Sequence, residues 1–551
     1  MKRQKKLVAL MLMVCLSCSL FSGCGEGNQD GNKDREKLTF DPADGPLVPY
    51  EEPLVVTQVR YQDSGLTFVG NESLEDNFMT DFYKEKLNIE WKSNWVSDPG
   101  SYYTKLNMDI AGNDLPDVMM VNASQLQTLI ENDQIEDLTD YYDYYASDLL
   151  RASVEYNDGY LLEYPTVDDC LYAIPLPLAY GANCPYMWIR TDWMEQLGLS
   201  APTTFDEFCD YIKALKSSGL VSGGSSGFSF LGVGSISFDA IAQMFGAYYD
   251  YYLDDNGELV YSSVTDGMKE ALEAVQGMVK EGIIDSDWAT KGSTEEERIA
   301  SGSVGILFGQ YWYPYLLRGS VMNNPNADWK AFPVPARDKN STAQPKEGSY
   351  LQGYVVVRKG YEHPEALIKT LNLSAEVWSS GGEYNSWIAE KTTTDYNSVN
   401  LIGDYILPYA YTDPSTLYTI SEQIIATLGS DNPDEEIKKY PFSQVTYSYL
   451  RDPSAPNYLT GNGWHLYKVY TETGPVLNEY TGNLVANKFN GMLSEEAAFN
   501  KTALDTSMVE TFTNIIMGES IDTFDSFTDN WFANGGSKIM KEANEWYSAK
   551  K

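Results

Sequence analysis

Histidine is nearly missing from this sequence, which has two histidines in 551 residues. Such scarcity argues against catalysis by a histidine base and against histidine-rich metal sites. The Gly-x-Ser-x-Gly turn of serine hydrolases and the glycine-rich loops that bind nucleotide phosphates are also missing. Carboxylate pairs, which a glycoside hydrolase needs, cannot be singled out among 79 acidic residues. The sequence therefore indicates neither an enzyme nor a cofactor, and a hydrolase with a carboxylate pair stays the alternative.

Basic residues are scarce as well. The chain has 39 lysines and arginines against 79 aspartates and glutamates, which gives a net charge of −40. A field of this sign repels nucleic acid and anionic lipid, so we expect neither as a partner. Long apolar runs are lacking too, since the longest is short of the ~20 residues that span a bilayer.

Cysteine is sparse as well. Six are present, and three of them precede residue 25. The other three are an odd number without the spacing of metal ligands: Cys170, Cys184 and Cys209. A disulfide framework would use more cysteines, so the pattern favours buried free thiols. A disulfide between Cys170 and Cys184, which flank a predicted turn, stays the alternative.

The N-terminus has the pattern of an export signal. Residues 1–23 begin with four basic residues, continue with an apolar run from Leu7 to Leu20 and end in small residues. Ser22-Gly23-Cys24 resembles the lipobox of bacterial lipoproteins, which implies that Cys24 carries a lipid. Residues 24–49 begin with a polar, charged stretch and are predicted to form a flexible tether.

The roughly 510 residues that follow the tether exceed one hydrophobic core, so we expect two α/β lobes. Strands are predicted at 54–61, 88–96 and 117–121, with helices between them at 74–87 and 102–110. This alternation favours a parallel sheet, whose ligand crevice lies at the carboxyl ends of the strands. The polar and aromatic residues at or just past those ends are Gln62, Asp63, Trp95 and Asn122.

The stretch from Cys170 to Phe208 reads as a crossing between the lobes. Apolar residues and prolines alternate up to Pro177, which suits an extended strand, and 186–189 is a second short strand. Thr191 is predicted to cap a helix that ends at Gly198. Thr204-Phe-Asp-Glu207 then forms a predicted capping box for the next helix.

Aromatic residues are abundant, with 41 tyrosines and 12 tryptophans. The apolar face of a sugar stacks on such rings, while Asp, Asn and Gln bond its hydroxyls. A neutral, hydroxyl-rich ligand also suits a chain of this charge. Ordinary packing is the alternative for each ring. The aromatic residues at predicted loops after strands are Trp95, Tyr180, Tyr311, Trp312, Tyr350, Trp387 and Trp464.

Several motifs together resemble the extracellular solute-binding proteins of family 1, the sugar- and oligosaccharide-binding lipoproteins of ABC importers, in their long Gram-positive subgroup. The motifs are Ser22-Gly-Cys24, Leu115-Pro-Asp-Val118 with Asn122, Tyr172-Ala-Ile-Pro175, the run Trp188–Leu199 with Pro202–Glu207, Gly302–Gly309, and Gly535–Ile539 with Glu542-Ala-Asn544. The resemblance covers essentially the whole chain after the signal. It implies a two-lobe, periplasmic-binding-protein-like (type II) α/β fold with hinge crossings and a ligand cleft between the lobes. Lobe 1 would hold 50–177 and a returning segment from about 350–420, and lobe 2 would hold 178–349 and much of about 421–551.

The resemblance also implies a function and a site. The protein would be a monomeric lipoprotein on the extracellular face of a bacterial membrane. It would capture an oligosaccharide and deliver it to an ABC permease without chemical change. The alternatives are a secreted glycoside hydrolase and a binding protein for another solute, such as a peptide or polyol. The implied ligand contacts are Gln62, Asp63, Asn122, Tyr180, Gln310, Tyr311, Trp312, Tyr350 and Gln352.

Overall fold

The computed structural model describes residues 37–62, 68–221, 228–229, 236–254, 256–286, 288, 295–394 and 412–550. The chain from Pro42 onward forms one compact unit, and the residues before it form a separate one. The predicted signal, Cys24, the first part of the tether and Asp63 lie outside the described residues. No helix in the described ranges is both long enough and apolar enough to cross a membrane.

The first sheet has five strands in the order β2-β1-β3-β14-β6. The predicted strands are confirmed as β1 (Leu54–Tyr61), β2 (Ile89–Ser97) and β3 (Val118–Val121), and β1 runs parallel to both of its neighbours. Strand β14 (Leu351–Val357) inserts between β3 and β6 (Ile174–Pro177) and is antiparallel to both. The sheet is therefore mixed rather than parallel, because its fourth strand comes from a distant part of the chain.

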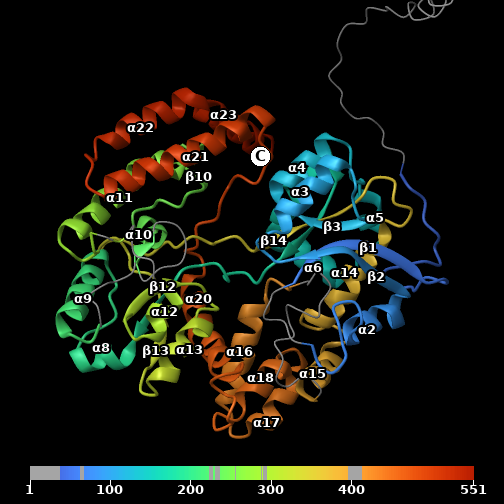
Figure 1. Cartoon of the computed structure of the whole chain (residues 1–551), viewed down its shortest axis with the longest axis horizontal. Helices are drawn as coiled ribbons and strands as arrows, with labels where there is room; N and C mark the ends of the chain where they lie inside the picture. The colour runs from blue at the N-terminus through green and yellow to red at the C-terminus, as the bar shows by residue number, and fades with distance from the viewer. Residues whose placement is uncertain are drawn as a thin grey trace, which may run out of the picture. The chain divides into compact units, whose positions relative to one another are not determined.

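Helices cover both faces of this sheet. Helices α3 (Tyr102–Gly112) and α4 (Ala123–Glu131) pack on β1 and β3 through a shared apolar core, whereas α2 (Phe78–Leu87) and α14 (Glu365–Trp378) lie on the opposite side (Figure 1). The Asn77 side chain accepts hydrogen bonds from two backbone amides of α2 and fixes its start. Asn88, in the left-handed conformation, ends the same helix and leads into β2.

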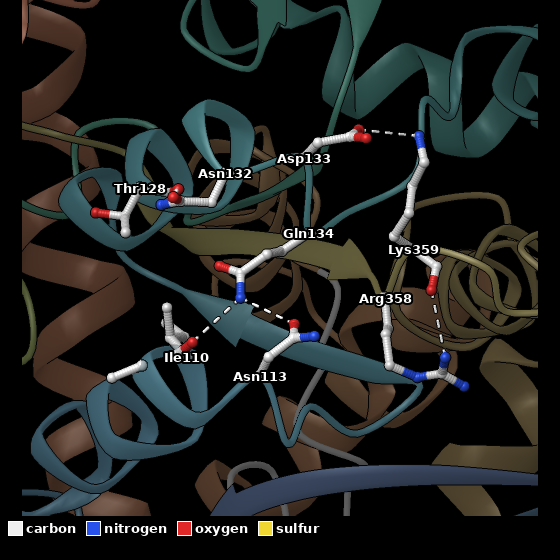
Figure 2. Close-up of a pocket in the computed structure, with 9 residues that line it drawn as sticks. Ile110, Asn113, Thr128, Asn132, Asp133, Gln134, Arg358 and Lys359 are labelled. Carbon is white, nitrogen blue, oxygen red and sulfur yellow. Dashed lines mark hydrogen bonds and ion pairs between the residues drawn. The ribbon is translucent and has the colours of Figure 1, made fainter. Parts of the chain in front are cut away.

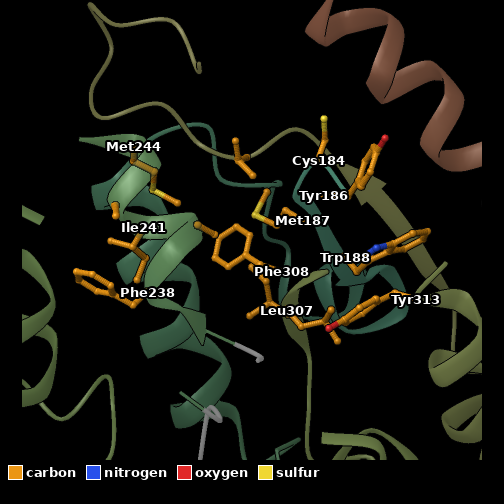
Figure 3. Close-up of a cluster of buried hydrophobic side chains, with 14 of the residues drawn as sticks. Cys184, Tyr186, Met187, Trp188, Phe238, Ile241, Met244, Leu307, Phe308 and Tyr313 are labelled. Atoms are coloured by element: carbon orange, nitrogen blue, oxygen red, sulfur yellow. The ribbon is translucent and has the colours of Figure 1, made fainter. Parts of the chain in front are cut away.

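The second sheet has the order β12-β7-β13 and is antiparallel throughout. Its strands are β12 (Ile306–Gly309), β7 (Tyr186–Arg190) and β13 (Trp329–Phe332). Every residue of β7 is buried, so this strand reads as a continuous apolar run. Figure 3 shows Tyr186, Met187 and Trp188 of β7 beside Leu307 and Phe308 of β12, with α10 (Phe238–Met244) packed against them.

Two helix caps next to this sheet differ from their predicted geometry, the first entirely and the second in part. Helix α8 (Thr191–Leu197) has Arg190 at its cap position, and the Thr191 hydroxyl instead donates to the Asp328 carboxylate at 2.5 Å. Helix α9 (Phe205–Ser218) is capped by Thr204 as predicted. The Glu207 carboxylate, however, accepts from the backbone and hydroxyl of Thr203, one residue earlier than in a capping box.

The C-terminal third of the chain completes the second core. Helices α21 (Glu495–Ile516), α22 (Thr523–Trp531) and α23 (Ser537–Ala549) pack together beside α11 (Asp266–Lys280) (Figure 1). Their buried side chains belong to the same apolar cluster as the second sheet. Helices α16 (Thr416–Leu428), α18 (Gln444–Leu450) and α20 (Gly474–Tyr480) contribute to that cluster too.

Two connections between the sheets run side by side. One leads from β6 to β7 and contains Tyr180, and the other leads from β13 to β14 and contains Glu347. The backbone amide of Leu178 donates to the Tyr350 carbonyl at 2.6 Å, and the Cys184 thiol donates to the Glu347 carbonyl at 2.9 Å. All three described cysteines are free thiols, with Cys184 and Cys209 buried and Cys170 half-buried. The crossing is therefore held by hydrogen bonds, and the disulfide alternative is wrong.

Candidate ligand-binding site

A pocket opens at the carboxyl edge of the first sheet. Asn122 follows β3, and because β14 is antiparallel to β3, the amino end of β14 with Gln352 reaches the same edge. The cavity there has a volume of about 320 Å³, and it is lined by Asn122, Ala123, Tyr164, Leu351, Gln352, Gly353, Tyr354, Phe489, Asn490 and Gly491. Ligands of open α/β sheets bind at this edge, so the pocket lies where sheet topology predicts a site.

Gln352 is the most distinctive polar group in this pocket. The pairing of β14 with β6 slips between Leu351 and Gly353, which leaves Gln352 as the extra residue of a β-bulge. Its side-chain amide makes no hydrogen bond to any described residue. A bulge re-aims a side chain, and an amide offers two donors and an acceptor. The amide of Gln352 is thus free to bond a ligand.

Asn122 lines the pocket but also has a structural task. Its side-chain oxygen accepts from the backbone amide of Gln125 at 2.9 Å, and the Gln125 side chain accepts from the backbone amide of Asn122. This reciprocal pair caps α4. Only the amide nitrogen of Asn122 remains for a ligand, so its predicted role is shared with helix capping.

A group of phenol rings adjoins the pocket along the two crossings. Tyr350 lies at its centre, with ring centroids 5.7 Å from Tyr180, 6.1 Å from Tyr156 and 5.9 Å from Tyr160. Tyr180 in turn stacks on Tyr418 of α16 at 6.5 Å. We call these five residues the tyrosine cluster. It contains both aromatic residues predicted for the crossings, Tyr180 and Tyr350.

The phenol hydroxyls of this cluster remain protonated. Burial raises the pKa of Tyr180 and of Tyr350 well above the usual value of a phenol, and the carboxylate of Glu347 acts in the same direction on both. A protonated phenol donates one hydrogen bond and accepts others. The cluster therefore combines apolar ring faces with neutral donors and acceptors.

Three members of the pocket and cluster were missed from the sequence although they share a spacing. Tyr156, Tyr160 and Tyr164 are four residues apart, which looks like a helix face. The backbone between the first two is left-handed at Asn157, Asp158 and Gly159, which breaks the helix. This turn brings Tyr156 and Tyr160 against the same ring, that of Tyr350, so contact with β14 rather than local pattern makes them neighbours.

Glu347 is a second residue that the sequence did not indicate. It is 7% exposed, and one of its carboxyl oxygens, Oε1, has no hydrogen-bond partner. Burial raises the pKa of Glu347, while a hydrogen bond from Tyr180 and the charge of Lys488 oppose the rise. Burial thus makes ionisation of Glu347 less favourable in the folded protein than in the unfolded chain.

The predicted aromatic turn does not line the pocket. Gln310, Tyr311 and Trp312 form a tight turn between β12 and α13 (Pro314–Asn323), and the Trp312 indole donates to the Gln310 amide oxygen at 2.6 Å. Trp312 is 37% exposed, whereas Tyr311 packs against the second core. Tyr313, which follows, is fully buried beside the second sheet (Figure 3).

Three other predicted aromatic residues lie in separate environments. Trp95 lies within β2, where its indole donates to Asp109 at 2.6 Å and Lys105 lies over its ring. Trp387 lies on α15 (Asn385–Thr394), not in a loop, and stacks on Phe82 at 4.2 Å. Trp464 lies on α19 (Gly463–Lys468) and packs on the second core. None of them lines the pocket around Gln352, and neither does Gln62, which directly follows β1.

A larger cavity, of about 690 Å³, lies at the opposite edge of the first sheet (Figure 2). Its polar groups are already engaged with one another: the Gln134 amide donates to the Ile110 carbonyl and to Asn113, and Lys359 pairs with Asp133 at 3.2 Å. Arg358 pairs with Asp117 at the amino end of β3. With its hydrogen-bonding capacity used internally, this cavity is a weaker candidate than the pocket at Gln352.

The architecture around the pocket indicates the class of protein. In the described ranges no cluster of histidine, cysteine, aspartate and glutamate has a geometry that could hold a metal ion. Two sheets joined by paired crossings, with a pocket beside them, define a two-lobe α/β binding protein of the periplasmic type. The solved alginate-binding protein AlgQ2 has this fold, with a TM-score of 0.60 and 16% identity over 92% of this chain and 100% of that chain.

From residue 68 to residue 376 the chain matches the model of the bacterial extracellular solute-binding proteins, and it belongs to that family. Lipoprotein LipO of Bacillus subtilis (strain 168) is 22% identical over 475 residues, which is 84% of this chain and 87% of LipO. The S. pneumoniae ABC-transporter substrate-binding protein FusA, solved in complex with kestose, has a TM-score of 0.58 and 16% identity over 90% of this chain and 99% of that chain. The family is one of binding proteins rather than enzymes.

Proposed function

We propose that this protein is the substrate-binding component of an ABC importer, and that it captures an oligosaccharide outside the cell and delivers it to the permease. The observation that carries the proposal is the free amide of the bulged Gln352, directed by topology to a pocket beside five tyrosines. The names of two similar proteins support the ligand class, because AlgQ2 is an alginate-binding protein and FusA was solved with kestose.

The chemistry of the pocket fits a sugar better than a peptide or an ion. The half-buried ring of Tyr164, which lines the pocket and stacks on the buried Tyr354, offers a stacking surface for the apolar face of a pyranose or furanose ring. The amide of Gln352 offers both donors and an acceptor, as hydroxyl groups require, and the Asn490 amide oxygen adds an acceptor while its nitrogen donates to the Tyr160 carbonyl. The pocket lining carries no charged side chain, so a neutral ligand loses no ion pair on binding.

The lobes in this proposal keep the boundaries expected from the sequence: 50–177 with a segment from about 350–420, and 178–349 with much of about 421–551. The two buried cores support most of this division, because one unites residues from Val59 to Ala173 with Tyr354 and Val356, and the other unites Ala179 to Val334 with Leu417 to Ala543. Since Leu417 and Ile420 lie in the second core, the returning segment of lobe 1 would end before them. Closure of the lobes about the paired crossings would then report an occupied pocket to the permease.

The protein would act as a monomer at the outer face of the cell membrane. Removal of residues 1–23 and lipidation of Cys24 would anchor it, and the tether would end before Pro42 rather than at residue 49, because Asp44 and Pro46 are bonded to Lys369 and Asn372 of the compact unit. The match to a protein named as a lipoprotein supports this proposal. Metabolic labelling of the full chain with a fatty-acid probe tests it, and Cys24→Ala should lose the label.

The function itself is tested by titrating the purified protein with neutral oligosaccharides, kestose and maltotriose among them, in thermal-shift and calorimetric experiments. A ligand that binds the folded state raises the melting temperature by mass action. Gln352→Ala should weaken binding at least about tenfold, since it removes a bidentate amide contact. Gln196→Ala is the matched control, because Gln196 is an exposed glutamine on α8, a helix that packs beside the second sheet.

Chromatography of the same mixtures checks for bond cleavage. Products that accumulate in proportion to protein would establish the hydrolase alternative instead. Stabilisation by short peptides with no response to any glycan would overturn the ligand class.

A further inference from the structure

A second cavity, of about 480 Å³, lies between helix α13 and the segment from residue 448 to residue 463. Its volume falls within the range of ~300–1,000 Å³ that is typical of small-molecule sites. It shares no lining residue with the pocket at Gln352. The two segments that it adjoins are the aromatic turn before α13 and the loop that ends at Trp464, both of which stood out in the sequence and neither of which serves the first pocket.

The cavity gathers two arginines that form no ion pair with a described carboxylate, although the charge of Arg451 acts on the neighbouring Asp452. Four other arginines of the described chain form ion pairs: Arg151, Arg190, Arg337 and Arg358. Within the same described ranges Arg318 and Arg451 form none, and both line this cavity. Arg318 is half-buried and Arg451 is exposed, so the cavity presents two guanidinium groups to solvent in a chain of net charge −40. We call this cavity the arginine pocket.

Arg318 is held in a fixed orientation. Its Nη1 donates to the carbonyls of Thr460 at 3.1 Å and Gly461 at 3.0 Å, and its guanidinium lies 4.0 Å from the ring centroid of Tyr315. These bonds occupy one end of the guanidinium fork and leave the Nε and Nη2 donors. That remaining pair of parallel N–H groups matches the two oxygens of a carboxylate.

Arg451 and the charges around it make the pocket net positive. Arg451 follows α18 at its C-terminus, and its guanidinium makes no hydrogen bond to a described residue. The lining holds a single acid, Asp452, whose Oδ1 accepts from the backbone amide of Ser454 at 3.0 Å and from its hydroxyl at 2.6 Å. His465, behind Tyr315, adds no charge at neutral pH, because burial lowers its pKa to about 4.

The loop that forms the far wall is tightly folded. Gly461 donates its backbone amide to the Asn457 carbonyl at 2.7 Å, and Trp464 donates to the Tyr458 carbonyl at 2.9 Å. Any Cβ at Gly463 would lie 2.8 Å from the Tyr449 carbonyl oxygen and would collide with the Tyr458 ring. The wall is therefore shaped before a ligand arrives, which reduces the entropy that binding must overcome.

Aromatic and amide groups complete the pocket. Tyr315 is 44% exposed, and Tyr449 and Tyr458 line the cavity with it. The side-chain amides of Asn457 and Asn462 also line the cavity and can form hydrogen bonds with sugar hydroxyls. Rings, amides and two cations in one cavity differ from the uncharged lining of the first pocket.

We propose that the arginine pocket is a second ligand-binding site, which takes an acidic sugar, with the carboxylate between Arg318 and Arg451 and the ring against the tyrosines. The choice of a sugar rests on the function proposed above, whereas the choice of an anion rests on the two unpaired arginines alone. The second site would let the receptor hold a glycan that carries both neutral and acidic units, or two separate glycans.

The test compares D-glucuronate with D-glucose, which differ only in a carboxylate in place of a hydroxymethyl group. Calorimetric titration of the full chain at low salt should show glucuronate binding at least about tenfold tighter, because a charge-assisted bidentate contact is lost with glucose. Raising the salt should weaken glucuronate binding, since added ions screen the arginines. Sulfate and inorganic phosphate are titrated alongside to separate an acidic sugar from a free anion.

Two variants locate the binding. Arg451→Gln removes an exposed guanidinium that makes no hydrogen bond or ion pair to a described residue, so the fold should be unaffected and glucuronate affinity should fall about tenfold. Arg318→Lys keeps the charge but loses the fork, and it should also weaken glucuronate. Arg337→Gln, an arginine outside the pocket that pairs with Glu270, is the matched control and should change nothing.

The outcomes separate this inference from the proposed function. Gln352→Ala should weaken binding of the neutral oligosaccharide at least about tenfold while the affinity for glucuronate is unchanged. If Gln352→Ala abolishes glucuronate binding and Arg451→Gln does not, the acidic sugar occupies the first pocket and the inference is wrong. Phosphate that binds as tightly as glucuronate, or glucose that does, contradicts it too. A protein that binds glucuronate at Arg451 but no neutral glycan would refute the proposed function alone.

Discussion

The phenol ring of Tyr180 lies edge-on to the ring of Tyr350, with 5.7 Å between their centroids. The two residues come from the two chain crossings that link the sheets, so their contact joins both crossings at the border of the pocket. Near this ring contact the backbones of the two crossings also approach each other closely, because Gly348 adopts φ +75° and lies against Asn183. The Asn183 amide also donates to the Ser349 carbonyl.

Gly348→Ala should destabilise the protein and disturb this contact. The new Cβ would lie 2.7 Å from the backbone carbon and oxygen of Asn183, and a left-handed alanine adds about 1–2 kcal/mol of strain. We expect a loss of about 3 kcal/mol or more in the free energy of unfolding, measured by urea denaturation.

Gly360→Ala is the control, because Gly360 has φ +76° and no heavy atom lies within 4 Å of the position that its Cβ would take. This variant should lower the free energy of unfolding only by the strain of a left-handed alanine, about 1–2 kcal/mol. Equal losses for the two variants would show that the crossings are not in contact at Gly348.

Glu347→Gln should stabilise the protein at neutral and higher pH. The pKa of Glu347 is raised in the folded state above its value in the unfolded chain, so folding favours the protonated carboxyl. This favourable contribution to the free energy of unfolding is complete below the pKa of the unfolded chain. It is lost as the pH rises through the pKa of the folded state, at about 1.4 kcal/mol per unit of difference between the two pKa values. Glutamine is neutral at every pH and should escape the loss.

The measurement is the free energy of unfolding of both proteins between pH 4 and pH 8. The two curves should meet near pH 4 and separate towards pH 8, with the variant more stable. Glu195→Gln, at an exposed position of α8, should run parallel to the wild type. A Glu347→Gln variant that is less stable at pH 8 would mean that the ionised carboxylate is favoured.

Trp312→Ala tests whether the aromatic turn contacts a ligand despite lying outside the pocket at Gln352. The indole is 37% exposed and bonds only within its own turn, to Gln310, so its removal should change the melting temperature little. If a neutral oligosaccharide reaches this turn, its affinity should fall about tenfold, as is typical for the loss of a stacking ring. Tyr313→Ala is the contrasting variant, because that fully buried ring should cost about 3–5 kcal/mol of stability. A Trp312→Ala protein that unfolds would show that the ring is part of the core.

Local chemistry in the sequence was enough to predict elements, but not how distant segments meet. Alternation and caps predicted β1, β2, α9 and the crossing at Tyr180, since those signals lie within a few residues of one another. Trp387 and Trp464 were assigned to loops because serine, glycine and asparagine surround them. In the structure both lie on helices, where Trp387 stacks on Phe82 and Trp464 packs on the second core.

In the candidate site, too, single residues could be predicted but the contacts between distant segments could not. Gln352 was predicted by resemblance, but its bulge depends on the pairing of β14 with β6, which no local pattern records. Glu347 becomes significant only through its burial beside Tyr180. Arg318 and Arg451 are far apart in the sequence, and only the fold shows that they share a cavity and form no ion pair with a described carboxylate.

His465 should make the protein sensitive to mild acid. Burial, and next the charge of Arg318, lower its pKa to about 4 in the folded state, although a hydrogen bond to the Gly461 carbonyl acts against the shift. The unfolded chain binds a proton at about pH 6.5, so stability is present above that pH and is lost as the pH falls towards 4. The loss reaches about 3 kcal/mol at the lower end of this window.

His465→Phe keeps a ring beside Tyr315, where the centroids are 5.7 Å apart, and removes the titrating group. Urea denaturation at pH 7 and pH 4.5 should therefore show a smaller fall in unfolding free energy for the variant than for the wild type. His363→Phe provides the comparison, because His363 is the only other histidine and its side chain is 40% exposed. If His363→Phe reduces the pH dependence and His465→Phe does not, the buried imidazole beside Arg318 is not the acid-sensitive group.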